Sequence, residues 1–311
     1  MRNIRFCRRE KESVASRVAC IAPRNCANCV LKIEDSFHGM LIVILSSFLL
    51  IMSAARSSIC DRCCEMNNHE LPQYELIKNN SRSKQPIISR KVVSNVSECE
   101  KFAASKKALA FNFVSARDRD GGHEITCQAL QCPEDHNMTT LVPVANHNYY
   151  SMYPVLVPPE NTTVECIPKA GIFLFSSESL NYTQARTFCR EKNATLAHVI
   201  SEERTEGLAK FVSSTLPRYV GLSNNDKERI WKNDFGEPLS CFDYRAWGEG
   251  QPSHSKGCVV LLGSSKDMSP TWEVAPCHMS LPFICEVIPL STQQLLSRRR
   301  HKHRHQESTR A

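Results

Sequence analysis

The sequence of 311 residues has no hydrophobic run long enough to cross a lipid bilayer. Its longest apolar stretch, residues 40–52, would rise only about 20 Å as a helix, whereas a bilayer core is about 30 Å thick. This length is typical of the hydrophobic part of a signal peptide, and the small residues Ser53, Ala54 and Ala55 suit cleavage by a signal peptidase. We therefore expect residues 40–55 to direct secretion and to be removed.

Residues 1–39 form a basic extension, with eight Lys and Arg residues against four Asp and Glu residues. Such an excess of positive charge favours the cytoplasmic side of a membrane. Because the extension is long for a signal peptide, two alternatives stay open: translation starts at Met40, or residues 40–55 are an uncleaved type II anchor. A membrane is an expected partner only in the second case.

The sequence also lacks the motifs of the common enzyme classes. It has no glycine-rich phosphate loop, no nucleophile elbow and no His-Glu-x-x-His helix. Structural zinc is not indicated either, because neither Cys-x-x-Cys pair (26/29 and 60/63) is followed by a complete four-ligand pattern. The scattered histidines, including His198, are interpreted as surface or hydrogen-bonded residues. We expect no enzyme.

Cysteine, by contrast, is abundant, and 16 cysteines are too many for a reduced cytosolic protein of this length. Six lie between residues 60 and 132 and six between residues 166 and 285, so each even group predicts a disulfide-stapled module. Six Asn-x-Ser/Thr sequons agree with an extracellular, glycosylated protein. These candidate sites are Asn79, Asn95, Asn137, Asn161, Asn181 and Asn193.

Positive charge is concentrated at the end of the chain, where residues 298–311 contribute +5 of the net charge of +7. We expect 288–311 to be a solvated, disordered tail. The alternative is attraction of residues 298–304 to acidic glycosaminoglycans. Nucleic acid is not an expected partner, because no aromatic residues interleave with the basic run and because the expected compartment is extracellular.

A proline-rich linker is predicted at 154–165, where Pro154, Pro158 and Pro159 remove backbone donors and restrict the preceding residues. It separates modules at 60–153 and 166–287. In the second module, apolar periodicity predicts helices at 179–192 and from Ser201. Short strands are expected at 171–175, 219–222, 257–262, 271–274 and 283–285. Helices followed by several short strands predict an α+β fold.

The order of Trp247, Gln251-Pro252, Cys258, Trp272, Cys277 and Phe283-Ile-Cys-Glu286 resembles the second half of a C-type lectin-like domain. The resemblance implies a disulfide-stapled fold of two helices, short antiparallel sheets and a long loop region. It also implies the disulfides Cys189–Cys285 and Cys258–Cys277. By arithmetic alone we pair the remaining Cys166 with Cys241. Trp231, Trp247 and Trp272 are expected to fill the core.

The N-terminal module resembles a PAN/apple-type cysteine-rich module through Cys99, the Phe111-x-Phe113 run and Cys127-x4-Cys132. That resemblance implies a helix with a cysteine near its start, packed on a small sheet that holds the Phe-x-Phe strand. The chain departs from the family in having alanines where further cysteines would be expected. Modules of this kind bind proteins or glycans.

In sugar-binding C-type lectins, one calcium ion is coordinated by a Glu-Pro-Asn or Gln-Pro-Asp triplet, an acidic residue just before the next cysteine, and a Trp-Asn-Asp triplet. The resemblance places the first triplet at Gln251-Pro252-Ser253 and the second at Trp272-Glu273-Val274. Here a hydroxyl replaces the carboxylate at Ser253, Lys256 replaces the acid, and Val274 cannot bind a cation. Only Gln251 and Glu273 remain as strong oxygen donors. We therefore expect no calcium and no other cofactor.

The ligand-binding candidates are the residues of this loop region: Gln251, Ser253, His254, Lys256 and Glu273. They predict a calcium-independent surface that recognises a carbohydrate or glycoprotein. The alternative for 251–253 is a structural turn without a ligand. At the level of the whole protein, the alternatives are an adhesion component of the extracellular matrix and a type II receptor for a protein ligand.

Overall fold

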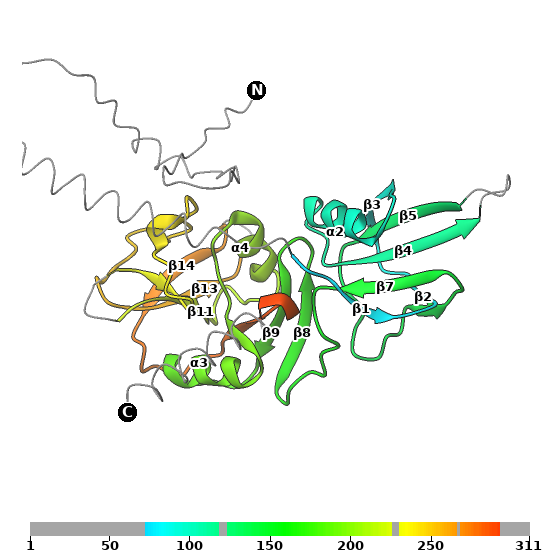
Figure 1. Ribbon diagram of the computed structural model, residues 1–311. Helices are drawn as coiled ribbons and strands as arrows, with labels where there is room; N and C mark the ends of the chain where they lie inside the picture. The colour runs from blue at the N-terminus through cyan, green and yellow to red at the C-terminus, as the bar shows by residue number, and fades with distance from the viewer. Residues whose placement is uncertain (1–71, 118–122, 226–229, 266–267, 293–311) are drawn as a thin grey trace, which may run out of the picture. The chain divides into compact units, whose positions relative to one another are not determined.

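The computed structural model describes residues 72–117, 123–225, 230–265 and 268–292 (Figure 1). The predicted extension 1–39, the segment 40–55 and the basic run 298–304 lie outside these ranges. In the described ranges, no helix is both long enough and apolar enough to span a membrane. Of the described residues, those within 72–236 and 244–292 belong to one structural unit, and Glu237–Asp243 belongs to a second unit that contains the short helix η2 (Leu239–Cys241).

The N-terminal part is an antiparallel sheet with one helix against it. The strand order is β1 (Glu75–Lys78), β7 (His147–Ser151), β4 (Ala110–Arg117), β5 (His123–Leu130) and β3 (Ile87–Val92). Strands β2 (Ser81–Ser83) and β6 (Leu141–Pro143) form a separate pair. Figure 1 shows α2 (Val96–Ser105) beside β4 and β5.

Helix α2 begins where the side chain of Asn95 accepts a hydrogen bond from the backbone of Glu98, which satisfies one free donor of the first turn. Cys99 and Ala103 lie on its buried face, and Cys99 is bonded to Cys127 of β5. Phe111, in β4, is fully buried in the same core. This is the arrangement that the PAN/apple resemblance implied, and membership of that family stays a proposal.

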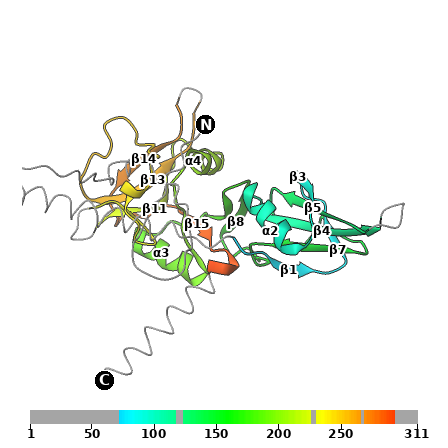
Figure 2. The same cartoon turned by 45° about the horizontal axis from the view of Figure 1, so that its top comes forward.

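The C-terminal part has two helices and two four-stranded sheets. One sheet has the order β10 (Ala194–Leu196), β15 (Ile284–Val287), β9 (Gly171–Ser176) and β8 (Thr162–Ile167). The other has the order β12 (Lys232–Asn233), β11 (Arg218–Asn224), β13 (Gly257–Leu262) and β14 (Thr271–Ala275), which Figure 2 shows from a second side. The helices are α3 (Tyr182–Glu191) and α4 (Glu202–Ala209). The predicted α+β class is confirmed.

Helix α3 shows why the sequence signals were sufficient for this element. Asn181 and Gln184 form a reciprocal capping box at its start. Tyr182, Ala185 and Cys189 lie on one buried face, as the helical spacing predicted. Cys189 is bonded to Cys285 of β15, and this bond closes a span of 96 residues, worth about 4–5 kcal/mol in the chain-entropy model.

The structure contains both disulfides that the C-type lectin resemblance implied, but it contradicts the pairing of Cys166 with Cys241. Cys166 is bonded to Cys132, and Cys241 is bonded to a different cysteine. The physical reason is that β8 begins at Thr162, inside the range expected as a linker, and pairs along β9. Cys166 therefore lies on an edge strand, within 6.0 Å (Cα–Cα) of Cys132. Although each module contains an even number of cysteines, one disulfide joins the two modules.

The two parts also share apolar packing. Leu109 and Tyr153, each 4% exposed, belong to the same buried cluster as Leu174 of β9. The backbone N–H of Met152 donates to the carbonyl of Leu109, and the N–H of Leu290 donates to the carbonyl of Met152. The lectin-like core is therefore completed by residues that precede it in the sequence.

Gly221 of β11 provides a test of this packing, because a Cβ atom there would overlap the carbonyl oxygen of Leu196. We expect Gly221→Ala to lower the stability of the folded chain by about 1–3 kcal/mol, since backbone atoms cannot give way cheaply. Calorimetry should show a melting temperature lower by several degrees. Gly248→Ala is the matched control, because its nearest non-neighbouring atom would lie at an ordinary 3.5 Å. Equal melting temperatures for the two variants would contradict the packing.

Candidate functional site

The candidate loop is positioned by the edge of strand β14. In an edge strand, every second residue points its N–H and C=O groups away from the sheet. Here the N–H of Trp272 donates to Ala246 (2.7 Å), and the N–H of Gly248 donates to the carbonyl of Trp272 (3.0 Å). A short parallel bridge joins Trp247 to Trp272. Residues 246–251 therefore run along the sheet edge and cover its free backbone groups.

Gln251 continues this edge pairing with its side chain. Its amide oxygen accepts hydrogen bonds from the N–H of Val274 (3.2 Å) and from the N–H of Ser253 (2.9 Å). The peptide bond between Gln251 and Pro252 is cis. The side-chain oxygen of Gln251, a predicted ligand donor, thus accepts hydrogen bonds from two backbone N–H groups.

The next four residues, Ser253 to Lys256, are all exposed. A buried side chain contacts the loop backbone: Asn224, which is 2% exposed, donates a hydrogen bond from its side-chain amide to the carbonyl of Ser255 (2.6 Å). Among the described residues, the side chains of His254 and Lys256 have no hydrogen-bond or ion-pair partner. The loop therefore presents free donor groups from a fixed backbone.

Glu273, the fifth predicted site residue, lies in strand β14 rather than in that loop. Successive side chains of a strand point to opposite faces. Glu273 pairs with the buried Val260 of β13, so it occupies the opposite face from Val274. The side chain of Val274 instead packs against Gly257, whose φ of +154° and lack of a Cβ make room for it. Gln251, Ser253, His254 and Lys256 lie on one loop, whereas Glu273 lies in strand β14 on the opposite face from Val274.

This donor set does not fit a calcium ion, which needs six to eight oxygen ligands, several of them charged. The oxygen of Gln251 already accepts two backbone hydrogen bonds, Val274 contributes methyl groups, and Lys256 contributes a cation. Across the described ranges, no group of three or more His, Cys, Asp and Glu side chains is placed to hold a metal ion.

The tryptophans support the loop from the other side. Trp272 is fully buried, and Trp247 and Tyr244 pack against it edge-on, with ring centroids 5.6 and 5.5 Å away. Trp231 packs on Trp247 at 5.3 Å. Trp231 and Trp247 are only half-buried, so the prediction that all three fill the core is wrong for these two. Trp247 belongs to the edge segment 246–251, and Trp231 packs on it.

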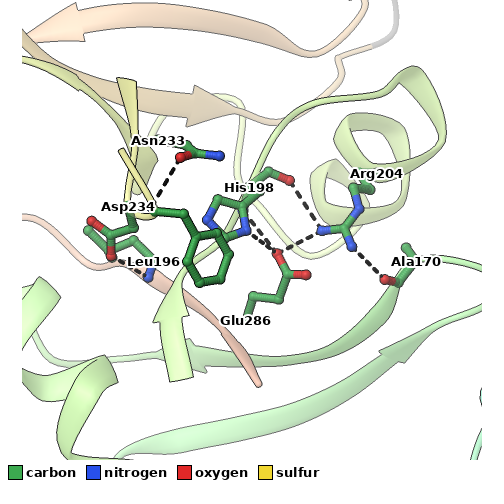
Figure 3. Close-up of polar contacts among 8 residues, drawn as sticks. Ala170, Leu196, His198, Arg204, Asn233, Asp234 and Glu286 are labelled. Atoms are coloured by element: carbon green, nitrogen blue, oxygen red, sulfur yellow. Dashed lines mark hydrogen bonds and ion pairs between the residues drawn. The ribbon is translucent and has the colours of Figure 1, made fainter. Parts of the chain in front are cut away.

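A second polar cluster lies in the interior, where His198 and Arg204 converge on the carboxylate of Glu286 (Figure 3). One oxygen of Glu286 lies 2.7 Å from Arg204 Nη1 and 3.1 Å from His198 Nδ1, and it also accepts from the backbone N–H of His198. Arg204 donates further to the carbonyl of Ala170 (2.9 Å). The His198 ring stacks on Phe235 at 4.6 Å. This cluster connects strand β15, helix α4 and the turn before β9.

Burial by itself raises the pKa of Glu286. The charges and hydrogen bonds of Arg204 and His198 lower the pKa by more, so that it falls from the ordinary 4.5 to about 2. The carboxylate is therefore ionised throughout the physiological range. The sequence contains a signal for this role, since Glu286 is the only charged residue in the apolar run between Leu281 and Leu290. His198, interpreted from the sequence as a surface or hydrogen-bonded histidine, is buried and hydrogen-bonded.

Residues 178–287 match the family model described as "Lectin C-type domain". Human collectin-10 is 31% identical over 114 residues, which are 36% of this chain and 39% of collectin-10. A C-type lectin of Micrurus corallinus is 30% identical over 117 residues, 35% of this chain and 71% of that protein. The structure of the mouse scavenger receptor C-type lectin carbohydrate-recognition domain is 24% identical and covers 42% of this chain and 98% of its own, with a TM-score of 0.35. The match thus spans well under two thirds of collectin-10.

The Glu286 cluster predicts how stability depends on pH. Because the pKa of Glu286 in the folded chain lies below its ordinary value of 4.5, the carboxylate stabilises the fold above pH 4.5, and this contribution is lost as the pH falls toward 2. Glu286→Gln leaves Arg204 without its counter-charge and should cost about 3–5 kcal/mol at neutral pH. Between pH 4.5 and 2 the variant should lose less stability than the parent, as measured by thermal denaturation.

The control for this experiment is Glu203→Gln, which breaks an exposed ion pair with Lys107 (2.8 Å). It should change stability by less than about 1 kcal/mol, because exposed pairs are screened by solvent. If Glu286→Gln and the parent lost stability in parallel as the pH fell, the assignment of a low pKa to Glu286 would be wrong.

Proposed function

The chain belongs to the C-type lectin family through residues 178–287, and from this we propose that it is an extracellular glycoprotein that binds a carbohydrate or glycoprotein without calcium. The binding surface is the loop from Gln251 to Lys256. A binding role also agrees with the absence of enzyme motifs from the sequence. The interaction that carries the calcium-independent part is the pair of backbone hydrogen bonds accepted by the Gln251 side chain.

Calcium-dependent sugar binding needs the carbonyl oxygen at the first position of the Gln251 triplet to be free to meet the ion. In this chain the two donors, Ser253 N–H and Val274 N–H, lie 2.9 and 3.2 Å from that oxygen. Moving it toward a cation would break both of these hydrogen bonds, one of them to the partly buried N–H of Val274. Lys256 adds electrostatic repulsion of a cation.

Export to the extracellular space is supported by the disulfides and the sequons. Four disulfides connect described cysteines, and such bonds persist in oxidising compartments. The sequon asparagines are exposed at five sites and half-buried at Asn181, so a glycosyltransferase could reach them. Two further hypotheses stay open: an adhesion role in extracellular matrix through the basic tail, and a type II receptor with a protein ligand. Detection of an N-terminus after Ala55 would exclude the anchored receptor.

The proposed function predicts that the exported chain captures glycans on an array to the same extent in calcium chloride and in EDTA. The melting temperature should also be equal in the two solutions, because an ion that bound only the folded chain would stabilise it. His254→Ala combined with Ser253→Ala should reduce capture, since both exposed side chains belong to the loop. Glu273→Gln, on the other face of β14, is the matched control and should leave capture unchanged.

Two results would contradict this proposal in different ways. Capture or stability that EDTA abolishes would show that the loop still builds a metal site. Absence of capture in both solutions would refute the carbohydrate part and favour a protein ligand.

A further inference from the structure

The Ser253–Lys256 loop carries one lysine, Lys256, which is exposed. Lys91 and Lys107 each pair with a glutamate at 2.8 Å. Lys256 has no acidic partner among the described residues, and neither has His254 two positions earlier. An exposed ammonium group is common on protein surfaces and by itself does not indicate a binding site. Whether Lys256 can bind a ligand therefore depends on how firmly the loop backbone holds it in place.

That backbone is fixed at four points. The Gln251 side chain holds the start of the loop to β14, and Asn224 holds Ser255 from below. Gly257 follows at once, with Val274 packed on it, and the next residue is Cys258, bonded to Cys277. A loop held in this way loses little conformational entropy when it binds, which favours affinity for a small charged ligand.

The same disulfide brings a second exposed imidazole to this region. The Cα atoms of Cys258 and Cys277 are 5.1 Å apart, and His278 directly follows Cys277. His278 is exposed and, in the part of the chain that the structure describes, has no hydrogen-bond or ion-pair partner. Lys256 and His278 thus lie within two residues of the Cys258–Cys277 disulfide along the chain, and His254 lies two residues further from it.

Along the chain, the acidic residues that flank this loop, Glu249 and Glu273, do not belong to it. Glu249 precedes Gln251 in the edge segment, and Glu273 lies on the face of β14 opposite Val274. No Asp or Glu occurs between Glu249 and Glu273 except Asp267, which lies outside the described residues. The loop therefore offers nitrogen and hydroxyl donors where a cation-binding loop would offer carboxylate oxygens.

We propose that the ligand of this loop is an acidic oligosaccharide, with its carboxylate or sulfate group bound by Lys256. This inference rests on the proposed function, and it names the class of sugar. An ammonium group forms charge-assisted hydrogen bonds with an anionic oxygen that are about twice as strong as those with a neutral hydroxyl. Lys256 is the residue that distinguishes acidic from neutral forms of one sugar, and the serine hydroxyls and His254 contact the neutral part.

The experiment uses an array on which each oligosaccharide core is present in sialylated, sulfated and neutral forms. The probes are the full glycosylated chain, Lys256→Gln and Lys210→Gln. Lys210 is also exposed and follows α4 near Gly263, at the opposite end of β13 from Gly257, so its replacement removes the same charge far from the loop. Both variants keep residues 298–311, so any contribution of the basic tail is equal.

We expect the parent to capture acidic forms more strongly than the neutral forms of the same core. Lys256→Gln should weaken capture of the acidic forms about tenfold, as loss of a hydrogen bond to a charged group does. Capture of the neutral forms should fall much less than capture of the acidic forms, and Lys210→Gln should behave as the parent. Lys256→Arg should restore the preference for acidic forms. Raised salt should weaken acidic capture by the parent more than by Lys256→Gln.

The comparison of sialylated with sulfated forms identifies which anionic group is bound. If acidic and neutral forms were captured equally, or if Lys256→Gln and Lys210→Gln had equal effects, the inference would be wrong while the proposed function stood. If no glycan of any form were captured, the proposed function would fail and this inference with it.

Discussion

The arrangement of the candidate site depends on one constraint, namely that the outward backbone groups of edge strand β14 need partners. An uncovered edge would leave its N–H and C=O groups free to pair with another chain. Residues 246–251 meet this need with backbone groups at Ala246 and Gly248, and then with the side chain of Gln251. Because Gln251 completes the edge, the loop that follows starts at a fixed point and direction.

The rest of the fold supplies a rigid base for that edge. The Glu286 carboxylate connects the last strand to α4 through Arg204 and to the segment after β10 through His198 (Figure 3). A buried ion pair of this kind is weak support for stability compared with apolar packing, but removal of one partner is costly. Leu109 and Tyr153 extend the apolar core across the Cys132–Cys166 bond. The lectin-like part is therefore stabilised by residues that lie before it in the chain.

The kind of ligand that the loop can bind follows from the contacts that the side chains of Gln251 and Val274 make. Once the oxygen of Gln251 accepts two backbone donors and the side chain of Val274 fills the space over Gly257, few oxygen donors remain to surround a cation. What remains exposed is a set of donors, with Lys256 as their charged member. A loop with this polarity favours a ligand that brings its own negative charge.

By itself, the sequence determined the α+β class, the Lys256 substitution, and both helices and five of the eight strands of the C-terminal part, because these depend on local periodicity, capping residues and residue identity. Only the tertiary structure decided the partner of Cys166, the engagement of Gln251, the face of β14 on which Glu273 lies and the Glu286 cluster. Each of these depends on which distant segments meet and on which face a side chain lies. Spacing along the chain does not contain that information, since a disulfide or hydrogen bond joins any two groups that the fold brings within reach.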